Sequence, residues 1–446
     1  MVFDTVIKGS LVLPEGIQRD GWLGVHDGLI EAIGEGEAPE AHETVSADGF
    51  VLPGVVDGQT HAGSIMGFGG LEDLTRSAAA GGVTTIVDMP FDEPNPVTTG
   101  DLLREKAEVA NRVAYIDVAI YGSVKPEVDT GEIARQAEAG ACAFKMSTYH
   151  ASKRFPRIPH PQMARAFAAI AETGLSVAVH NEDQELVDDA IARFREAGKK
   201  GANHHHPTRP PLSELLANSI ILEIGAATGA RAHIVHSSLA RGFDMAKNYR
   251  EQGYAATAET CLHYLIFDEA DVIEMGARGK VNPPIRPDQK DAIWQKLLDG
   301  DVAFVSSDHC SWPLERKPDN DIFQAAPGAP GVECLLPVLA DEAINRRGLK
   351  IDIVVDMLCE APARHFGLYP RKGVLKVGAD ADIVVLRGDR NTVDETRLHC
   401  ELAPWSPYHG REIGFRVGDV WLRGRKIFDG ADVVATPGTG RFVRPS

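Results

Sequence analysis

Short apolar runs alternate with stretches of helical periodicity from residue 51 onward. Each apolar run is long enough for one buried strand, and each helical stretch is long enough to cross back to the start of the next. The predicted strands are Leu52–Val56, Thr84–Met89, Ile116–Tyr121, Ala141–Met146, Ser176–His180, His233–His236, Ala255–Glu259 and Ala303–Ser307. The predicted helices include Leu71–Ala80, Gly100–Ala110, Gly131–Ala139, Pro161–Thr173, Leu212–Thr228, Arg241–Gln252 and Lys290–Leu298. Such a pattern predicts an α/β fold with a (β/α)8 TIM-like barrel over residues 51–369.

Both ends of the chain have the pattern of β-structure. The N-terminal strands are predicted at Asp4–Lys8, Gly24–His26 and Leu29–Ile33, and the C-terminal strands at Val374–Lys376, Ile383–Leu386, Val417–Leu422 and Lys426–Phe428. Glycine-containing turns separate them. We therefore expect residues 1–50 and 370–446 to form one small β-sandwich domain beside the barrel, with the final segment ATPGTGRFVRPS as a surface extension.

Charge and composition narrow the classes of function. The chain carries 64 acidic and 46 basic residues, a net charge of −18, which argues against a nucleic-acid partner. It has no run of ~18 apolar residues that would span a membrane. The six cysteines include no CxxC pair, and the start has no signal-peptide pattern. We expect a cytoplasmic protein with reduced thiols that handles small molecules.

The first barrel strand ends in a row of polar residues. The stretch VLPGVVDGQTHAG, residues 51–63, is apolar until Asp57, Gln59 and His61, which share one face because side chains alternate along a strand. Other predicted strands also end in polar groups: Asp88, Lys145, His180, His236, Glu259 and Asp308. In barrels of this kind the active site lies at the carboxyl ends of the strands, so this row predicts its location.

Five of these residues have the chemistry of a metal site: His61, Lys145, His180, His236 and Asp308. Neutral imidazoles and carboxylates suit zinc or another first-row divalent ion. A lysine at the end of a buried strand is costly to keep charged, so its pKa is expected to fall. A neutral amine reacts with CO2, and the resulting carbamate resembles a carboxylate ligand. We therefore expect one or two metal ions, with a CO2-derived carbamate on Lys145.

The motifs resemble those of the amidohydrolase superfamily, and of its cyclic amidohydrolase group in particular: hydantoinases, dihydropyrimidinases, allantoinases and dihydroorotases. The matching segments follow one another over nearly the whole chain. They are LPGVVDGQTH, AAAGGVTTIVDMP, AFKMS, VAVHNED, HIVHSS, AETCLHYL, KVNPPIR, SSDHC, APGVECLLPVL, ARHFGLYPRKGVLKVGADADIVV and WSPYHGREIGFRV. Each motif alone is weak, but their order and spacing make the resemblance strong.

The resemblance implies a role for each ligand. His61 and Asp308 would bind a buried metal, His180 and His236 a second one, and carbamylated Lys145 would bridge both. Asp308 would act as general base and then as general acid while a C–N bond of a cyclic amide, ureide or imide is hydrolysed.

The resemblance also implies substrate contacts. Tyr149 would donate to the developing oxyanion, with His150 beside it, and Asn282 would contact the substrate. Relatives of this kind are often homo-oligomers, so a dimer or tetramer is expected.

Gln59 departs from the family pattern because it replaces the first histidine of the HxH motif. An amide oxygen is a weaker zinc ligand than an imidazole. Three interpretations remain open. The site holds one metal at Lys145, His180 and His236; it holds two, with Gln59 as a weak ligand or lost as one; or the chain is a catalytically silent homologue that serves as a binding or assembly subunit.

Two further positions bear on substrate choice. Gly63 occupies the place where dihydroorotases carry a carboxylate-binding arginine, which disfavours dihydroorotate and suggests space for a bulkier or uncharged substrate. His204–His206 lie in a Gly/Pro-rich loop, for which we favour a solvated role over a lid or substrate contact.

Overall fold

A computed structural model of the protein describes residues 2–150 and 152–446. The predicted barrel is confirmed, and its strands follow one another around the sheet in chain order. They are β5 (Val55–His61), β6 (Val83–Asp88), β7 (Asp117–Ser123), β8 (Ala143–Ser147), β9 (Ser176–His180), β10 (Arg231–Ile234) and β11 (Ala256–Ala258). The chain continues from β11 into β12 (Thr260–Cys261), which pairs with β13 (Val305–Ser306). β14 (His309–Cys310) follows β13 and pairs with β5, which closes the barrel.

Apolar side chains fill the barrel interior below the strand ends. The interior residues include Val56, Val87, Tyr121 and Phe304. Phe366 and Leu368 close the end of the barrel opposite the carboxyl ends of the strands. The C-terminal segment also takes part, so its prediction as a surface extension is wrong. The Val118 N–H donates to Arg441 O, and the Val443 N–H donates to Val118 O, each at 2.9 Å. Because Val443 is buried among the interior residues, this segment is anchored in the barrel and does not simply extend over the surface.

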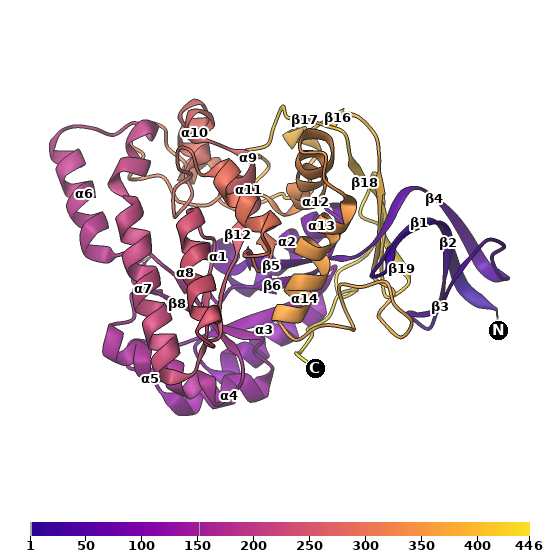
Figure 1. Ribbon diagram of the computed structural model, residues 1–446, viewed down its shortest axis with the longest axis horizontal. Helices are drawn as coiled ribbons and strands as arrows, with labels where there is room; N and C mark the ends of the chain where they lie inside the picture. The colour runs from indigo at the N-terminus through magenta and orange to yellow at the C-terminus, as the bar shows by residue number, and fades with distance from the viewer. Residues whose placement is uncertain (1, 151) are drawn as a thin grey trace.

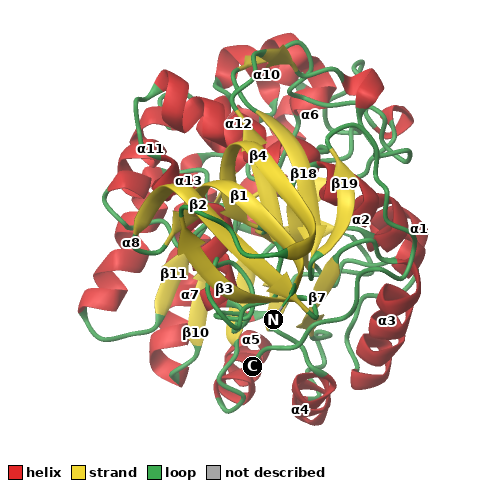
Figure 2. Ribbon diagram, turned by 90° about the vertical axis from the view of Figure 1, so that its right-hand side faces the viewer, coloured by secondary structure: helices red, strands yellow, loops and turns green. Residues whose placement is uncertain are grey.

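Helices surround the barrel, and Figure 2 shows them as a ring around the strands. They are α1 (Gly63–Met66), α2 (Gly70–Ala80), α3 (Gly100–Val113), α4 (Thr130–Ala139), α5 (His160–Ala171), α6 (Gln184–Glu196), α7 (Pro211–Thr228), α8 (Ala240–Glu251), α9 (Leu262–Ile266), α10 (Glu269–Met275), α11 (Lys290–Leu298), α12 (Leu335–Ala340), α13 (Ile351–Val355) and α14 (Ala361–His365). The predicted helices correspond to α2–α5, α7, α8 and α11. None of the described helices is long and apolar enough to cross a membrane.

The two chain ends form a second sheet beside the barrel, as predicted (Figure 1). Its seven strands belong to one hydrogen-bonded sheet in the order β19-β18-β15-β4-β1-β2-β3. They are β1 (Phe3–Leu13), β2 (Gly16–His26), β3 (Leu29–Glu35), β4 (Ala41–Pro53), β15 (Ile383–Arg387), β18 (Arg416–Leu422) and β19 (Arg425–Asp429). A separate pair, β16 (Asn391–Thr392) and β17 (Glu412–Ile413), lies outside it.

The boundary between sheet and barrel lies later than the sequence pattern suggested. Val51, Leu52 and Pro53 pair with β15 at the end of the long strand β4, so Leu52 does not begin the first barrel strand. The chain passes from one sheet to the other at Gly54, where an added Cβ would overlap the Thr84 side chain. The predicted strand Val374–Lys376 is also wrong, because those residues form a turn-rich connection.

Candidate active site

The polar row of the sequence gathers at the carboxyl ends of the barrel strands. Gln59 and His61 end β5, Lys145 lies in β8, His180 ends β9, and His236 follows β10. Asp308 sits between β13 and β14. His236 and Asp308 have φ angles of 39° and 49°, the left-handed region that costs a residue with a Cβ about 1–2 kcal/mol. Backbone strain of this kind clusters at functional sites, and here two predicted ligands carry it.

His180 and His236 face each other. His180 Nδ1 lies 3.0 Å from His236 Nε2, and His180 Nε2 lies 2.8 Å from Glu182 Oε2. Burial lowers the pKa of His236 well below its usual range, and the nearby His180 and Lys145 charges lower it further. The imidazole is therefore neutral at physiological pH, the form in which histidine binds metals.

Asp308 is bonded by the two residues that end β5. Gln59 Nε2 donates to Asp308 Oδ1 at 2.8 Å, and His61 Nε2 lies 3.3 Å from the same oxygen. Burial alone would raise the pKa of Asp308, but the hydrogen bond and charge of His61 lower it below its usual value. Rotating the Gln59 amide would set its oxygen against an ionised carboxylate, so the observed orientation is the favourable one. Gln59 Oε1 is then buried and lacks a partner among the described residues.

Lys145 is buried at the centre of this group. Burial lowers its pKa to about 8, although the charges of Asp308 and Glu259 act in the opposite direction. Lys106 makes a useful contrast because it is fully buried yet has a raised pKa. Its Nζ lies 2.7 Å from Asp88 Oδ2 and 2.9 Å from both Asp92 oxygens. Lys106 is thus a paired structural cation, whereas Lys145 has a substantial neutral fraction near pH 8.

Asp57 supports the strand that carries Asp308. It accepts hydrogen bonds from the Ser307 N–H at 3.0 Å, from the Ser307 hydroxyl, and from the Gln59 N–H at 3.3 Å. Burial raises its pKa to about 7, an effect that these hydrogen bonds partly oppose. Asp57 therefore fixes both Gln59 and the residue before Asp308, a role that its place in the polar row did not reveal.

The predicted substrate residues differ in their positions. Tyr149 lies beside His180, with ring centroids 6.4 Å apart. Asn282 Oδ1 is buried without a hydrogen-bond partner among the described residues. His150 is exposed, and its backbone N–H donates to Gln184 Oε1 at 2.5 Å. The structure thus brings Tyr149 to the histidines but gives the ring of His150 no such contact within the described chain.

The space expected beside Gly63 is filled. A Cβ at this position would overlap Asp92 Oδ1. Asp92 is held there by Lys106, so the carboxylate cannot easily withdraw. The expectation that Gly63 leaves added room is therefore wrong, because the Asp92 carboxylate fills the space that a Cβ at this position would need.

The histidine triplet is anchored rather than solvated, which corrects the favoured interpretation. His205 is buried, with Nε2 2.8 Å from Val281 O; His206 Nδ1 lies 3.3 Å from Glu269 Oε1, and the His204 ring packs on Phe194. Arg209 lies in the same loop, four residues after His205, and its guanidinium pairs with Glu182. Sequence reasoning missed Glu182 and Arg209; their signals were a carboxylate two residues after His180 and the Arg-Pro pair of the loop.

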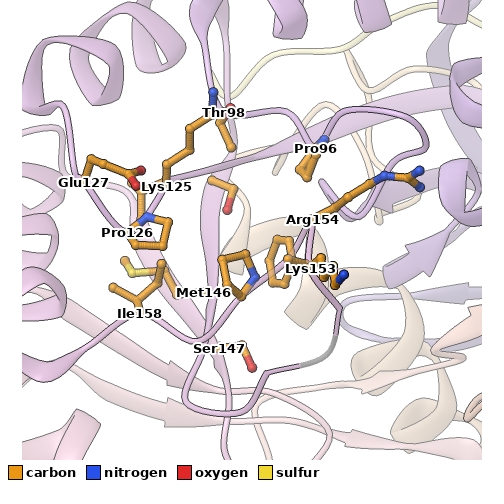
Figure 3. Close-up of a pocket in the computed structure, with 14 residues that line it drawn as sticks. Pro96, Thr98, Lys125, Pro126, Glu127, Met146, Ser147, Lys153, Arg154 and Ile158 are labelled. Carbon is orange, nitrogen blue, oxygen red and sulfur yellow. The ribbon is translucent and has the colours of Figure 1, made fainter.

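A cavity of about 270 Å³ lies beside the ends of β7 and β8 (Figure 3). Met146 and Ser147, which follow Lys145, form part of its wall. Lys125, Lys153 and Arg154 also line it, and all three are exposed at its rim. It lies next to the strand that carries Lys145 but does not contain the predicted ligands.

The donor atoms fit a divalent metal ion. His236 Nδ1, His61 Nδ1 and Gln59 Oε1 are buried without partners among the described residues, but none of these atoms belongs to the facing nitrogen pair, His180 Nδ1 and His236 Nε2. The facing nitrogens of His180 and His236 are already close enough to share one cation. A further group, Cys261, His263 and Asp308, has donor atoms within 4.8 Å of one another. The His204–His206 triplet belongs to none of these groups.

Comparison with known proteins identifies the class. The model of the amidohydrolase family matches residues 50–425, and the chain belongs to this family. It is 35% identical to an allantoinase of Rubrobacter xylanophilus, over 99% of this chain and 98% of that protein. It is 32% identical to an allantoinase of Deinococcus radiodurans, over 100% and 99% of the two chains.

A solved structure supports the same family assignment. The L-hydantoinase (dihydropyrimidinase) of Arthrobacter aurescens superposes with a TM-score of 0.95 at 30% identity, covering 99% of this chain and 100% of that one. The protein is therefore a hydrolase that acts on C–N bonds in cyclic amides, in a family whose members generally depend on metal ions.

Proposed function

We propose that the protein opens the ring of a hydantoin-type cyclic ureide with a single catalytic metal ion held by carbamylated Lys145, His180 and His236. The observation that carries this proposal is the hydrogen bond from Gln59 Nε2 to Asp308 Oδ1. The neutral Gln59 amide donates a hydrogen bond to Asp308 and so takes the place that a buried cation would otherwise occupy beside this carboxylate. Gln59 is therefore a lost ligand, and Asp308 acts as a base rather than as a metal ligand.

Zinc suits the proposed set of one carbamate oxygen and two imidazole nitrogens. A divalent ion in such a site, when bound, polarises a carbonyl oxygen and lowers the pKa of water. The lowered pKa of buried His236 keeps its imidazole neutral and available as a ligand. Lys145 contributes through its neutral fraction, which is the form that reacts with CO2.

Asp308 is proposed to take the proton of the attacking water and pass it to the leaving ring nitrogen. Gln59 and His61 hold its carboxylate in position, and His61 lowers its pKa so that it stays ionised. Tyr149, next to His180, is proposed to donate a hydrogen bond from its hydroxyl to the oxyanion that develops on the substrate. Asn282 Oδ1 is proposed to accept a hydrogen bond from a ring N–H of the substrate.

A hydantoin-type ring is favoured over dihydroorotate for a structural reason. Position 63 is a glycine rather than an arginine that could pair with a substrate carboxylate, and Asp92, held by Lys106, fills the space beside it. The names of the relatives, allantoinases and an L-hydantoinase, point to the same ring. By resemblance, we also propose a cytoplasmic homo-oligomer, a dimer or a tetramer.

The test combines metal content with turnover. The protein is purified with zinc, manganese or cobalt and bicarbonate, and assayed on allantoin, 5-substituted hydantoins, dihydropyrimidines and dihydroorotate. We expect ring opening of a hydantoin-type substrate and none of dihydroorotate. Absence of both bound metal and turnover, with both restored by Gln59→His, would instead identify a catalytically silent homologue.

A further inference from the structure

A buried charge pair lies directly behind His180. Glu182 is 0% exposed, and its Oε2 accepts a hydrogen bond from His180 Nε2 at 2.8 Å. The guanidinium of Arg209 contacts the same oxygen. Glu182 lies just before α6, whose first turn is capped by Asp183, and Arg209 lies just before α7. The pair therefore joins two segments that reach the site from different parts of the chain.

The pair determines which nitrogen of His180 carries the proton. A carboxylate paired with an arginine is an acceptor only, so the ring nitrogen that faces it must be the donor. His180 Nε2 then holds the proton, and Nδ1, which faces His236 Nε2 at 3.0 Å, keeps its lone pair. A histidine that binds a metal needs its lone pair on the nitrogen that faces the ion.

We propose that Glu182 and Arg209 are positioning residues that fix the tautomer and ring orientation of His180 for metal binding. The proposal rests on the function proposed above, since it assigns His180 to the metal. Arg209 also packs against the ring of Tyr149, with its guanidinium carbon 4.7 Å from the ring centroid. One arginine thus contacts both the support of a metal ligand and the proposed oxyanion donor.

The loop that carries Arg209 is built to hold it in place. His205 Nε2 lies 2.8 Å from Val281 O, which anchors the loop four residues earlier. Arg286 Nη1 donates to the backbone oxygen of Arg209 at 2.7 Å. This assigns a role to the histidine triplet: it anchors the loop that delivers Arg209, and it is not itself a ligand.

The second histidine is supported in a different way. Arg286 Nη2 pairs with Glu214 Oε2 at 3.0 Å, and Glu214 accepts hydrogen bonds from the Ser238 N–H at 3.0 Å and the Ser238 hydroxyl at 2.6 Å. Ser238 lies two residues after His236, so this pair holds the turn and not the ring. Of the two facing histidines, only His180 has a carboxylate bonded directly to its imidazole within the described chain, which makes Glu182 the residue to test.

The substitution Glu182→Gln keeps the size of the side chain and removes its charge. Its amide would either set N–H groups against Arg209 or rotate and donate to His180 Nε2, which would move the proton to Nδ1. We expect the affinity for zinc or cobalt, measured by competition with a chelator, to fall about 10- to 100-fold. The absorption spectrum of the bound cobalt should also change, and Glu182→Asp should restore part of the native affinity.

Glu342→Gln is the matched control. Glu342 is buried, lies 2.7 Å from Arg411 and 3.3 Å from Arg347, and belongs to the helical segment after α12. We expect this variant to keep the native metal affinity and cobalt spectrum, even if its stability falls. Native affinity and spectrum in Glu182→Gln would overturn the proposal.

A second readout does not depend on bound metal. In metal-free protein labelled with ¹⁵N-histidine, the His180 ring is identified from the spectrum of His180→Gln. The native ring should be protonated at Nε2, and the ring in Glu182→Gln should shift toward protonation at Nδ1. That shift without any metal binding or turnover would reject the proposed function and leave the positioning role intact. An unchanged tautomer in a chain that binds metal and turns over would reject the positioning role alone.

Discussion

The two sides of the active site satisfy their polar atoms in opposite ways. On the histidine side, His180 Nδ1 and His236 Nε2 point at each other at 3.0 Å, and only one of them can hold a proton there. On the aspartate side, Asp308 Oδ1 already receives Gln59 Nε2 and lies against His61 Nε2. The difference teaches that similar donor atoms have different uses. The histidine side is arranged to bind a cation, whereas on the aspartate side the Gln59 amide stabilises the carboxylate that a cation would otherwise stabilise.

The largest effect should come from removing a ligand on the histidine side. We predict that His236→Ala loses bound metal and all measurable turnover, because two ligands cannot hold the ion. The loss of affinity should exceed the ~10- to 100-fold that outer partners of a ligand are worth. Metal analysis and steady-state assays check this prediction. Retention of a full equivalent of metal in the variant would show that the metal is bound by other residues.

The next effect should come from the base. We predict that Asp308→Asn lowers kcat by about 10²- to 10⁴-fold while the metal content stays at the native level. The amide keeps the shape of the side chain but cannot accept the proton of water. Loss of metal together with activity would show that Asp308 is a ligand, and would break the contrast between the two sides.

A smaller effect should follow when the base loses its amide donor. Gln59→Leu removes the hydrogen bond that favours ionised Asp308, so the pKa of Asp308 should rise. Because the base must be ionised, the acid limb of the kcat/KM profile should move to higher pH by about 1 to 2 units. The metal content should not change. A profile that keeps its native acid limb would exclude the Gln59–Asp308 bond from the reaction.

The smallest effect concerns the formation of the carbamate. Burial lowers the pKa of Lys145 to about 8, and only the neutral amine reacts with CO2. Reactivation of metal-free protein by bicarbonate and zinc should therefore speed up with pH until about pH 8 and then level off. Lys145→Arg, which has no reactive amine at any pH, is the control and should show no CO2-dependent recovery. A rate that is flat between pH 6 and pH 8 would contradict the assignment.

Much of this site was predictable because its residues obey strand periodicity. Gln59 and His61 share a face for that reason, and Lys145, His180 and His236 lie at or near the ends of apolar runs that form β8, β9 and β10. The barrel followed from the same pattern. Local pattern also misled: Val51 and Leu52 look continuous with the first barrel strand but pair with β15, because strand pairing is a long-range choice.

What the sequence concealed depends on contacts between distant segments. Asp92 fills the space beside Gly63 only because Lys106 on α3 holds it there. Arg209 reaches Glu182 across 27 residues of sequence, and nothing local in the histidine triplet indicates that it anchors this arginine. The C-terminal segment pairs with β7 through a bridge between Phe442 and Val118, residues that are far apart in the sequence. Such contacts follow from tertiary packing, which local pattern does not encode.

The number of metal ions per chain tests the central claim most directly. The native protein and Gln59→His are loaded with zinc and bicarbonate, freed of excess metal, and analysed for zinc and protein in the same samples. The account predicts a single ion in the native chain, and a second in Gln59→His, where an imidazole competes for the place of the amide. Two ions in the native chain would contradict it, because Asp308 would then be a ligand beside Gln59.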